Sequence, residues 1–68
     1  MKPENFNMSV RKFLKSVGVQ SQHEIERAVE AAIASGKLKG GETLPARMTL
    51  TVDGIALSVT IDGRISLE

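Results

Sequence analysis

The hydrophobic residues of this chain change their spacing in its last third, and this change most limits the fold. Up to Ile33 they recur three or four positions apart, whereas from Met48 to Ile61 they alternate with small polar residues. The first spacing places side chains on one face of a helix, and the second places them on one face of a strand. We therefore expect an α+β protein with its helices first and its strands last.

A first helix is expected to start after Asn7 or Ser9, since either side chain can cap a helix. Gly18 is expected to end it in the left-handed conformation that glycine adopts easily. The apolar residues between these points stand at i, i+3, i+4 and i+7: Val10, Phe13, Leu14 and Val17.

A second helix is expected to start at Ser21. Glu24 follows three residues later, which is the spacing of a capping box, and Gly36 is the expected end. On this interpretation Ser21–Gly36 forms a wall of a small core and not a DNA-reading helix, because it opens with two acids. Its apolar stripe comprises Ile25, Ala28, Val29, Ala32 and Ile33.

The alternating segment predicts a hairpin. Asp53-Gly54 is a strong signal for a two-residue turn, which would pair Val52 with Ile55. A second Asp-Gly, at 62–63, predicts a three-residue loop with a bulge, after which Val59 faces Ile65. One face of the sheet would then hold Met48, Leu50, Val52, Ile55, Leu57, Val59 and Ile61.

The predicted fold is α+β, with two N-terminal helices packed on one face of a three-stranded antiparallel β-meander (ααβββ). Residues 1–68 would form a single small domain, and residues 36–47 its one long connection. The other sheet face is either solvated or a self-association surface, since it is small and uncharged. Its predicted members are Thr49, Thr51, Ala56, Ser58, Thr60 and Ser66.

Several classes of site are not expected. The chain has no cysteine, and His23 is a lone histidine without a second ligand at metal spacing. Residues 36–43, "GKLKGGET", depart from a phosphate-binding loop at Glu42, where that loop needs lysine. No apolar run suits a membrane span, and the N-terminus has no apolar signal core, so we expect neither export nor a membrane. We predict no catalytic residue, no cofactor and no metal.

Residues 32–47, "AIASGKLKGGETLPAR", resemble the end of the first helix in winged-helix repressors of the gluconate-repressor class. The resemblance covers sixteen residues and ends where DNA contact would begin, because a hairpin follows here. It keeps a nucleic-acid-binding alternative open.

Nearly the whole chain resembles a small uncharacterised bacterial family of the domain-of-unknown-function type. The resemblance rests on "FNMSVRKFLKSVGV", "SQHEIERAVEAAIASGKLKG" and "LPARMTLTVDG". It implies a short bacterial protein of the cytoplasm, with no assigned activity.

The expected function is that of a small non-catalytic protein-interaction module that binds itself, as a homodimer, or an unknown protein partner. The alternative is a winged-helix-like nucleic-acid-binding protein that uses a basic helix face. An anionic partner, either nucleic acid or an acidic protein surface, is expected to contact five basic residues: Arg11, Lys12, Lys15, Lys37 and Lys39.

Overall fold

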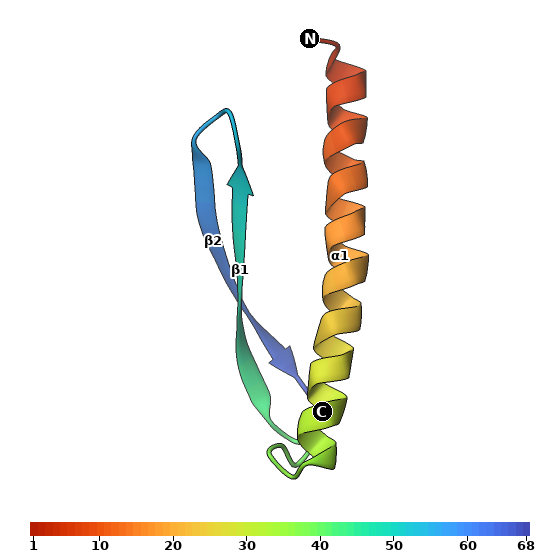
Figure 1. Ribbon diagram of the computed structural model, residues 1–68, viewed down its shortest axis with the longest axis vertical. Helices are drawn as coiled ribbons and strands as arrows, with labels where there is room; N and C mark the ends of the chain where they lie inside the picture. Colours follow the sequence, from red (N-terminus) through yellow and green to blue (C-terminus); the bar gives the residue numbers. More distant parts are fainter. The chain divides into compact units, whose positions relative to one another are not determined.

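Helical structure runs without a break from Pro3 to Ala34 in the computed structural model of residues 1–68 (Figure 1). This single helix, α1, is followed by two antiparallel strands, β1 (Thr43–Val52) and β2 (Leu57–Ser66). The predicted ααβββ fold is therefore wrong: the chain is α+β with the order αββ. It divides into two compact units, Met1–Lys37 with α1 and Leu38–Glu68 with the hairpin.

The predicted helix break at Gly18 does not occur, and neither does the capping box of Ser21 and Glu24. A glycine inside a helix costs about 1 kcal/mol relative to alanine. Two new helix ends would instead leave several backbone N–H and C=O groups without partners. The apolar residues also stay in phase across the region, because Ser21 lies four positions after Val17 and four before Ile25. One continuous helix therefore has a lower free energy than two helices separated at Gly18.

Both ends of α1 have residues that are typical of helix termini. Pro3 occupies the first turn, where its missing N–H costs no hydrogen bond. At the other end the predicted stop at Gly36 is confirmed, with a φ of 82°. The Gly36 N–H donates to the Ile33 carbonyl at 3.1 Å, and the Lys37 N–H donates to the Ala32 carbonyl at 2.9 Å. This pair of bonds is a Schellman motif.

The hairpin turn is longer than predicted. Val52 pairs with Leu57, so Asp53–Ala56 form a four-residue connection that includes Ile55. Gly54 has a φ of 91° and Ala56 a φ of 53°. Moving from two to four loop residues shifts the register by an even number, so the strands keep their apolar face. Only Ile55 leaves it, and this residue is 68% exposed in the turn.

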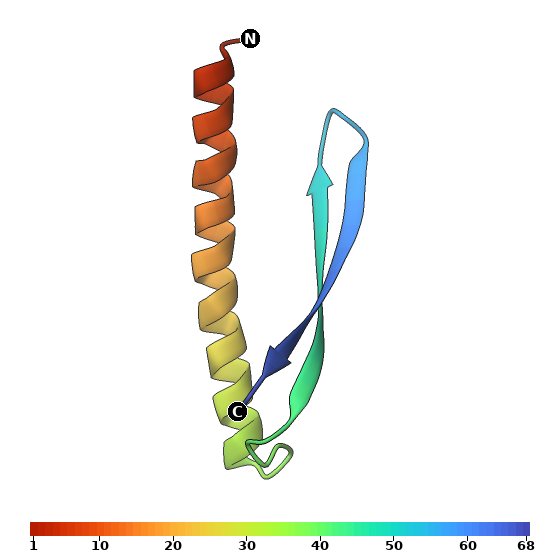
Figure 2. The ribbon, with the colours of Figure 1, turned by 180° about the vertical axis from the view of Figure 1, so that it is seen from behind.

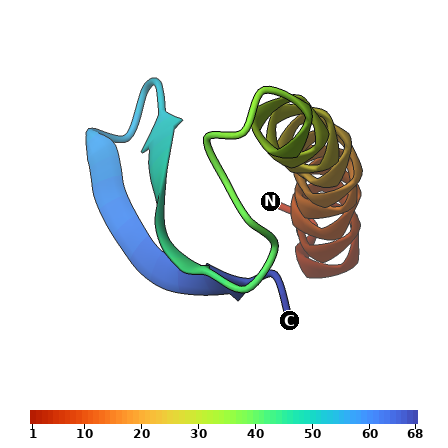
Figure 3. The same cartoon turned by 90° about the horizontal axis from the view of Figure 1, so that it is seen from below.

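The predicted third strand and its bulge at residues 61–63 are also absent. β2 continues through Asp62 and Gly63, which pair with Arg47 and Ala46. Residues 43–47, expected in the long connection, supply the first half of β1. The strands twist about each other along their length, as Figure 2 shows from behind and Figure 3 from the end where β1 begins. This is the usual right-handed twist of a two-stranded ribbon.

No residue of the chain is buried. Both units therefore lack the buried apolar surface that normally stabilises such elements. A helix depends largely on packing of its apolar face, and an isolated hairpin is marginally stable in water. Although α1 is long, no helix is apolar enough along its length to cross a membrane.

Candidate functional site

One side of α1 carries a long apolar surface, here called the α1 stripe. Three of its largest side chains are about half exposed: Phe6 at 56%, Phe13 at 52% and Leu14 at 53%. Phe6 lies four residues before Val10, a spacing that could have extended the predicted helix towards the N-terminus. The stripe comprises Phe6, Val10, Phe13, Leu14, Val17, Ser21, Ile25, Ala28 and Ala32, with the half-buried Val29 beside one edge and Glu24, about five turns after Phe6, at the other.

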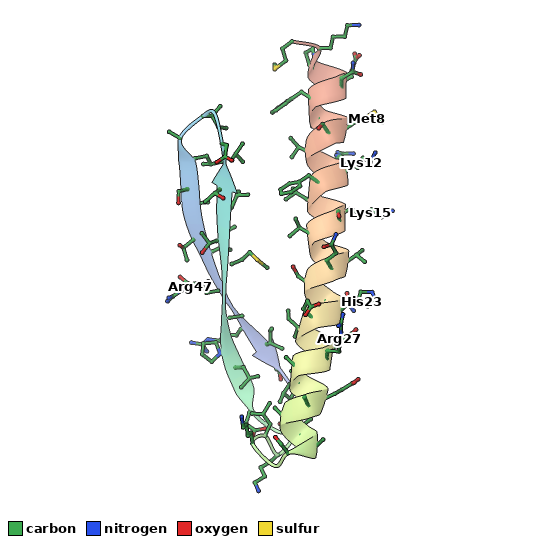
Figure 4. All side chains as sticks on the ribbon, viewed as in Figure 1. Met8, Lys12, Lys15, His23, Arg27 and Arg47 are labelled. Carbon is green, nitrogen blue, oxygen red and sulfur yellow. The ribbon has the colours of Figure 1, made fainter.

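The opposite side of α1 is polar, and its interactions are local. Met8, Lys12, Lys15, His23 and Arg27 project from this side (Figure 4). The Arg27 guanidinium reaches from this side to Glu24 at the edge of the α1 stripe, and its Nη2 lies 3.1 Å from Oε1 of that residue. The two side chains are about 70% exposed, so this pair adds only a few tenths of a kcal/mol.

The structure brings together three of the five basic residues predicted to contact an anionic partner. Arg11, Lys12 and Lys15 line a shallow, open depression on α1 together with Asn5, Met8 and Ser9. Lys37 lies at the other end of the same unit, beyond the last turn of α1, and Lys39 belongs to the second unit. Three of the five predicted residues thus form one cluster of cations on the first half of the helix.

Lys39 has a different role through its backbone. Its N–H donates to Oε2 of Glu42 at 2.8 Å, and the N–H of Gly40 donates to Oε1 at 2.9 Å. These hydrogen bonds, the one from Lys39 foremost, lower the pKa of the Glu42 carboxyl below its ordinary 4.5. In a phosphate-binding loop such N–H groups would face a phosphate, but here the chain's own carboxylate occupies them.

The hairpin has an apolar side, here called the hairpin face. Its middle is the most exposed part, with Met48 at 43%, Val59 at 42% and Ile61 at 57%. The predicted apolar face is confirmed here for every residue but Ile55. The cross-strand pairs of the hairpin face are Leu44–Ile65, Ala46–Gly63, Met48–Ile61, Leu50–Val59 and Val52–Leu57.

The sequence predicted that the polar side of the hairpin is uncharged, and this prediction is wrong. Arg47 and Asp62 are direct cross-strand partners, and the arginine Nε donates to Oδ1 at 3.0 Å. Arg64 lies on the same side, opposite Pro45. Charges and a proline thus occupy the half of each strand nearest the open end, and both features discourage pairing with another strand edge. The hairpin face, not this polar side, is the apolar surface of the hairpin.

No cluster of acidic and histidine side chains in the structure has the composition of a metal site. His23 lies in the middle of α1 and not in the first turn of a second helix, and it is exposed. The α1 stripe and the hairpin face are the two apolar surfaces of the chain that are suited to binding a partner.

A family model described as a family of unknown function (DUF6494) matches residues 1–68, so the chain belongs to this family. The predicted membership of a domain-of-unknown-function family is confirmed. No curated protein and no solved structure matches the chain.

Proposed function

We propose that this member of the DUF6494 family is a small, non-catalytic protein-interaction module that associates with itself through its apolar surfaces. One observation carries the proposal: the chain buries no side chain and exposes fourteen large hydrophobic ones. Single exposed hydrophobic residues are common, but a continuous stripe along a helix marks an interaction surface.

The absence of catalysis in this proposal is supported by the distribution of reactive side chains. Asp62 is engaged with Arg47, Glu24 with Arg27, and Glu42 with backbone N–H groups of its loop. The remaining acids lie on the open surface of the helix or the turn, or at the C-terminal end, where no enclosed cavity would bind and desolvate a substrate. The proposal places the module in the cytoplasm of a bacterium, in keeping with its cysteine-free sequence.

Leu14 and Val19 provide a matched test of the proposal. Their side chains are 53% and 50% exposed, but Leu14 belongs to the α1 stripe and Val19 lies on the far side of the helix. Leu14→Glu would place a carboxylate in the self-association surface, where desolvation opposes it. Val19→Glu makes the same chemical change outside that surface.

The measurement is sedimentation equilibrium over a wide range of protein concentrations. We expect the unaltered chain to associate, Leu14→Glu to raise its dissociation constant about tenfold or more, and Val19→Glu to leave it nearly unchanged. Circular dichroism of each variant checks that α1 is still formed. A chain that stays monomeric at millimolar concentration would overturn the proposal.

Nucleic-acid binding is the second candidate, favoured by the depression that Arg11, Lys12 and Lys15 line on α1. Three cations in one place would bind phosphates through an electrostatic contribution that is strongest at low salt. An amide-resolved NMR titration with duplex and single-stranded DNA tests it. Shifts confined to these residues that fade as salt rises would support this function, whereas silence at low salt would exclude it.

A further inference from the structure

We infer that two copies of α1 bind each other in the antiparallel direction, with their α1 stripes in contact. This inference rests on the proposed function, because it specifies which surface self-associates and in which direction. It is carried by three properties of α1: the repeat of its stripe, the distribution of side-chain size and the distribution of charge.

The α1 stripe repeats every eleven residues. Eleven residues in three turns correspond to about 3.67 residues per turn, close to the 3.6 of a straight helix. The stripe therefore runs almost parallel to the helix axis for about 40 Å, and two such helices can stay in contact over that length with little supercoiling. The repeating sets are Phe6, Val17 and Ala28; Val10, Ser21 and Ala32; Leu14 and Ile25.

Side-chain size is unevenly distributed along the stripe. The first half carries Phe6, Val10, Phe13 and Leu14. The second half carries Ser21, Ala28 and Ala32 along the centre of the stripe, with the larger Ile25 and Val29 along one edge. Parallel helices would place phenylalanine against phenylalanine at one end and alanine against alanine at the other. Antiparallel helices place large residues against small ones at both ends, which is how facing surfaces interdigitate at native density.

The resulting register can be written residue by residue. The midpoint of α1 lies between residues 18 and 19, and crossing the two helices at residue 19 brings two pairs at the centre of the stripe to the same level. Both pairs join a larger residue to a smaller one. They are Val10 with Ala28 of the second copy and Val17 with Ser21.

The distribution of charge along α1 also favours the antiparallel direction. Up to Gly18 the chain has four basic residues and one acid, whereas Val19–Ala34 has three acids and one base. An antiparallel pair places each basic half beside an acidic half. The charged side chains of the two halves are exposed, and in this arrangement they attract each other between the copies.

These exposed ion pairs contribute little to affinity, about 0–1 kcal/mol each. Their effect is on direction, because parallel helices would instead set the acidic halves side by side. Size and charge therefore select the same orientation by independent physical means, and the apolar stripe supplies the affinity.

The test measures distances between identical positions of the two copies. The chain has no cysteine, so Val19→Cys and Asn5→Cys variants each carry a single nitroxide label on the polar side of α1. Double electron–electron resonance on the associated protein then gives the distance between labels. Sedimentation equilibrium and circular dichroism of both variants confirm that association and helix are retained.

In the antiparallel pair, the labels at position 19 lie level with each other, about 20–30 Å apart across two helix diameters. The labels at position 5 are displaced along the axis by 28 residues, or about 42 Å, so their distance is larger by about 20 Å. Similar short distances at both positions would mean a parallel pair. They would overturn this inference and leave the proposed function standing.

Two further outcomes separate the claims. An associated protein in which position 19 gives the longer distance would show that another surface, such as the hairpin face, joins the copies, and would also overturn the inference. Absence of dipolar coupling together with a monomeric sedimentation profile would overturn both the inference and the proposed function.

Discussion

Arg47 stands directly opposite Asp62 in the hairpin, and its Nε donates to the aspartate Oδ1 at 3.0 Å. The pair is exposed and contributes about 0.2–1 kcal/mol, so its main consequence is geometric. A residue that pairs across strands cannot also form the tip of a turn. Asp62-Gly63 is therefore strand, although the same dipeptide at residues 53–54 begins the real turn.

Substitution of the two glycines distinguishes these positions. Gly63→Val is expected to stabilise the hairpin by up to about 1 kcal/mol, because a Cβ at Gly63 meets open space and valine favours strands. Gly54→Val is expected to destabilise it by about 1–2 kcal/mol, because φ is 91° there. Thermal unfolding followed by circular dichroism gives the two signs. A loss of stability for Gly63→Val would contradict the continuous strand and support the turn at Asp62-Gly63 that the sequence predicts.

A similar pair of glycines lies in and after α1. Gly18→Ala should raise the free energy of unfolding by about 0.5–1 kcal/mol, since Gly18 lies inside the helix and an added Cβ meets nothing within 4 Å. Gly36→Ala should lower it by about 1 kcal/mol, because φ is 82° in the Schellman motif. Urea unfolding measures both. If Gly18→Ala were destabilising, α1 would not be continuous.

The sequence was sufficient to predict which residues share an apolar face but not where each element ends. A glycine can end a helix or lie within it, and only its φ decides, so Gly18 and Gly36 have the same local signature and opposite roles. Ser21 and Glu24 likewise form a capping box only where a helix begins. In the hairpin, loops of two and four residues give the same alternation, and hence the same face.

The candidate site was predictable to a similar degree. The apolar positions of α1 and most of the hairpin face follow from periodicity alone. Phe6 was missed because Asn7 and Ser9 are good capping residues and favoured a later start for the helix. The charged pair on the polar side of the hairpin was missed because Asp62 was assigned to a turn. Whether the basic residues cluster depends on helix length, which places Lys37 far from Arg11 along one unit.

The loop before β1 is expected to depend on pH through Glu42. Its carboxylate accepts the N–H groups of Lys39 and Gly40, and the first of these bonds is the main cause of its lowered pKa. Because the folded pKa lies below the unfolded one, the stabilisation is present above the ordinary value of 4.5 and is lost as pH falls through the folded pKa.

Amide NMR on acidification checks this expectation. The Lys39 and Gly40 resonances should move together, with a midpoint below 4.5. Glu42→Gln should abolish this titration, because the amide side chain carries no proton that titrates in that range. A midpoint at or above the ordinary carboxyl value would contradict the hydrogen bonding described for the loop.

The antiparallel pairing of α1 can be tested further by exchanging the members of one facing pair. Val10→Ala alone would leave two alanines facing each other, and Ala28→Val alone would crowd two valines together. Cavities and overpacking each cost about 1–3 kcal/mol, so both single variants should weaken association by about tenfold or more. The double variant V10A/A28V restores the total volume and should recover most of the loss, because facing residues are energetically coupled.

A matched exchange on the polar side of α1 provides the control for this cycle. Val19→Ala and Ala34→Val alter helix propensity in the same way as the stripe variants, but both positions lie away from the α1 stripe and are exposed. They should leave the dissociation constant from sedimentation equilibrium almost unchanged. If the losses of V10A and A28V simply added in the double variant, the two residues would not face each other, and a different register or direction of the helices would be required.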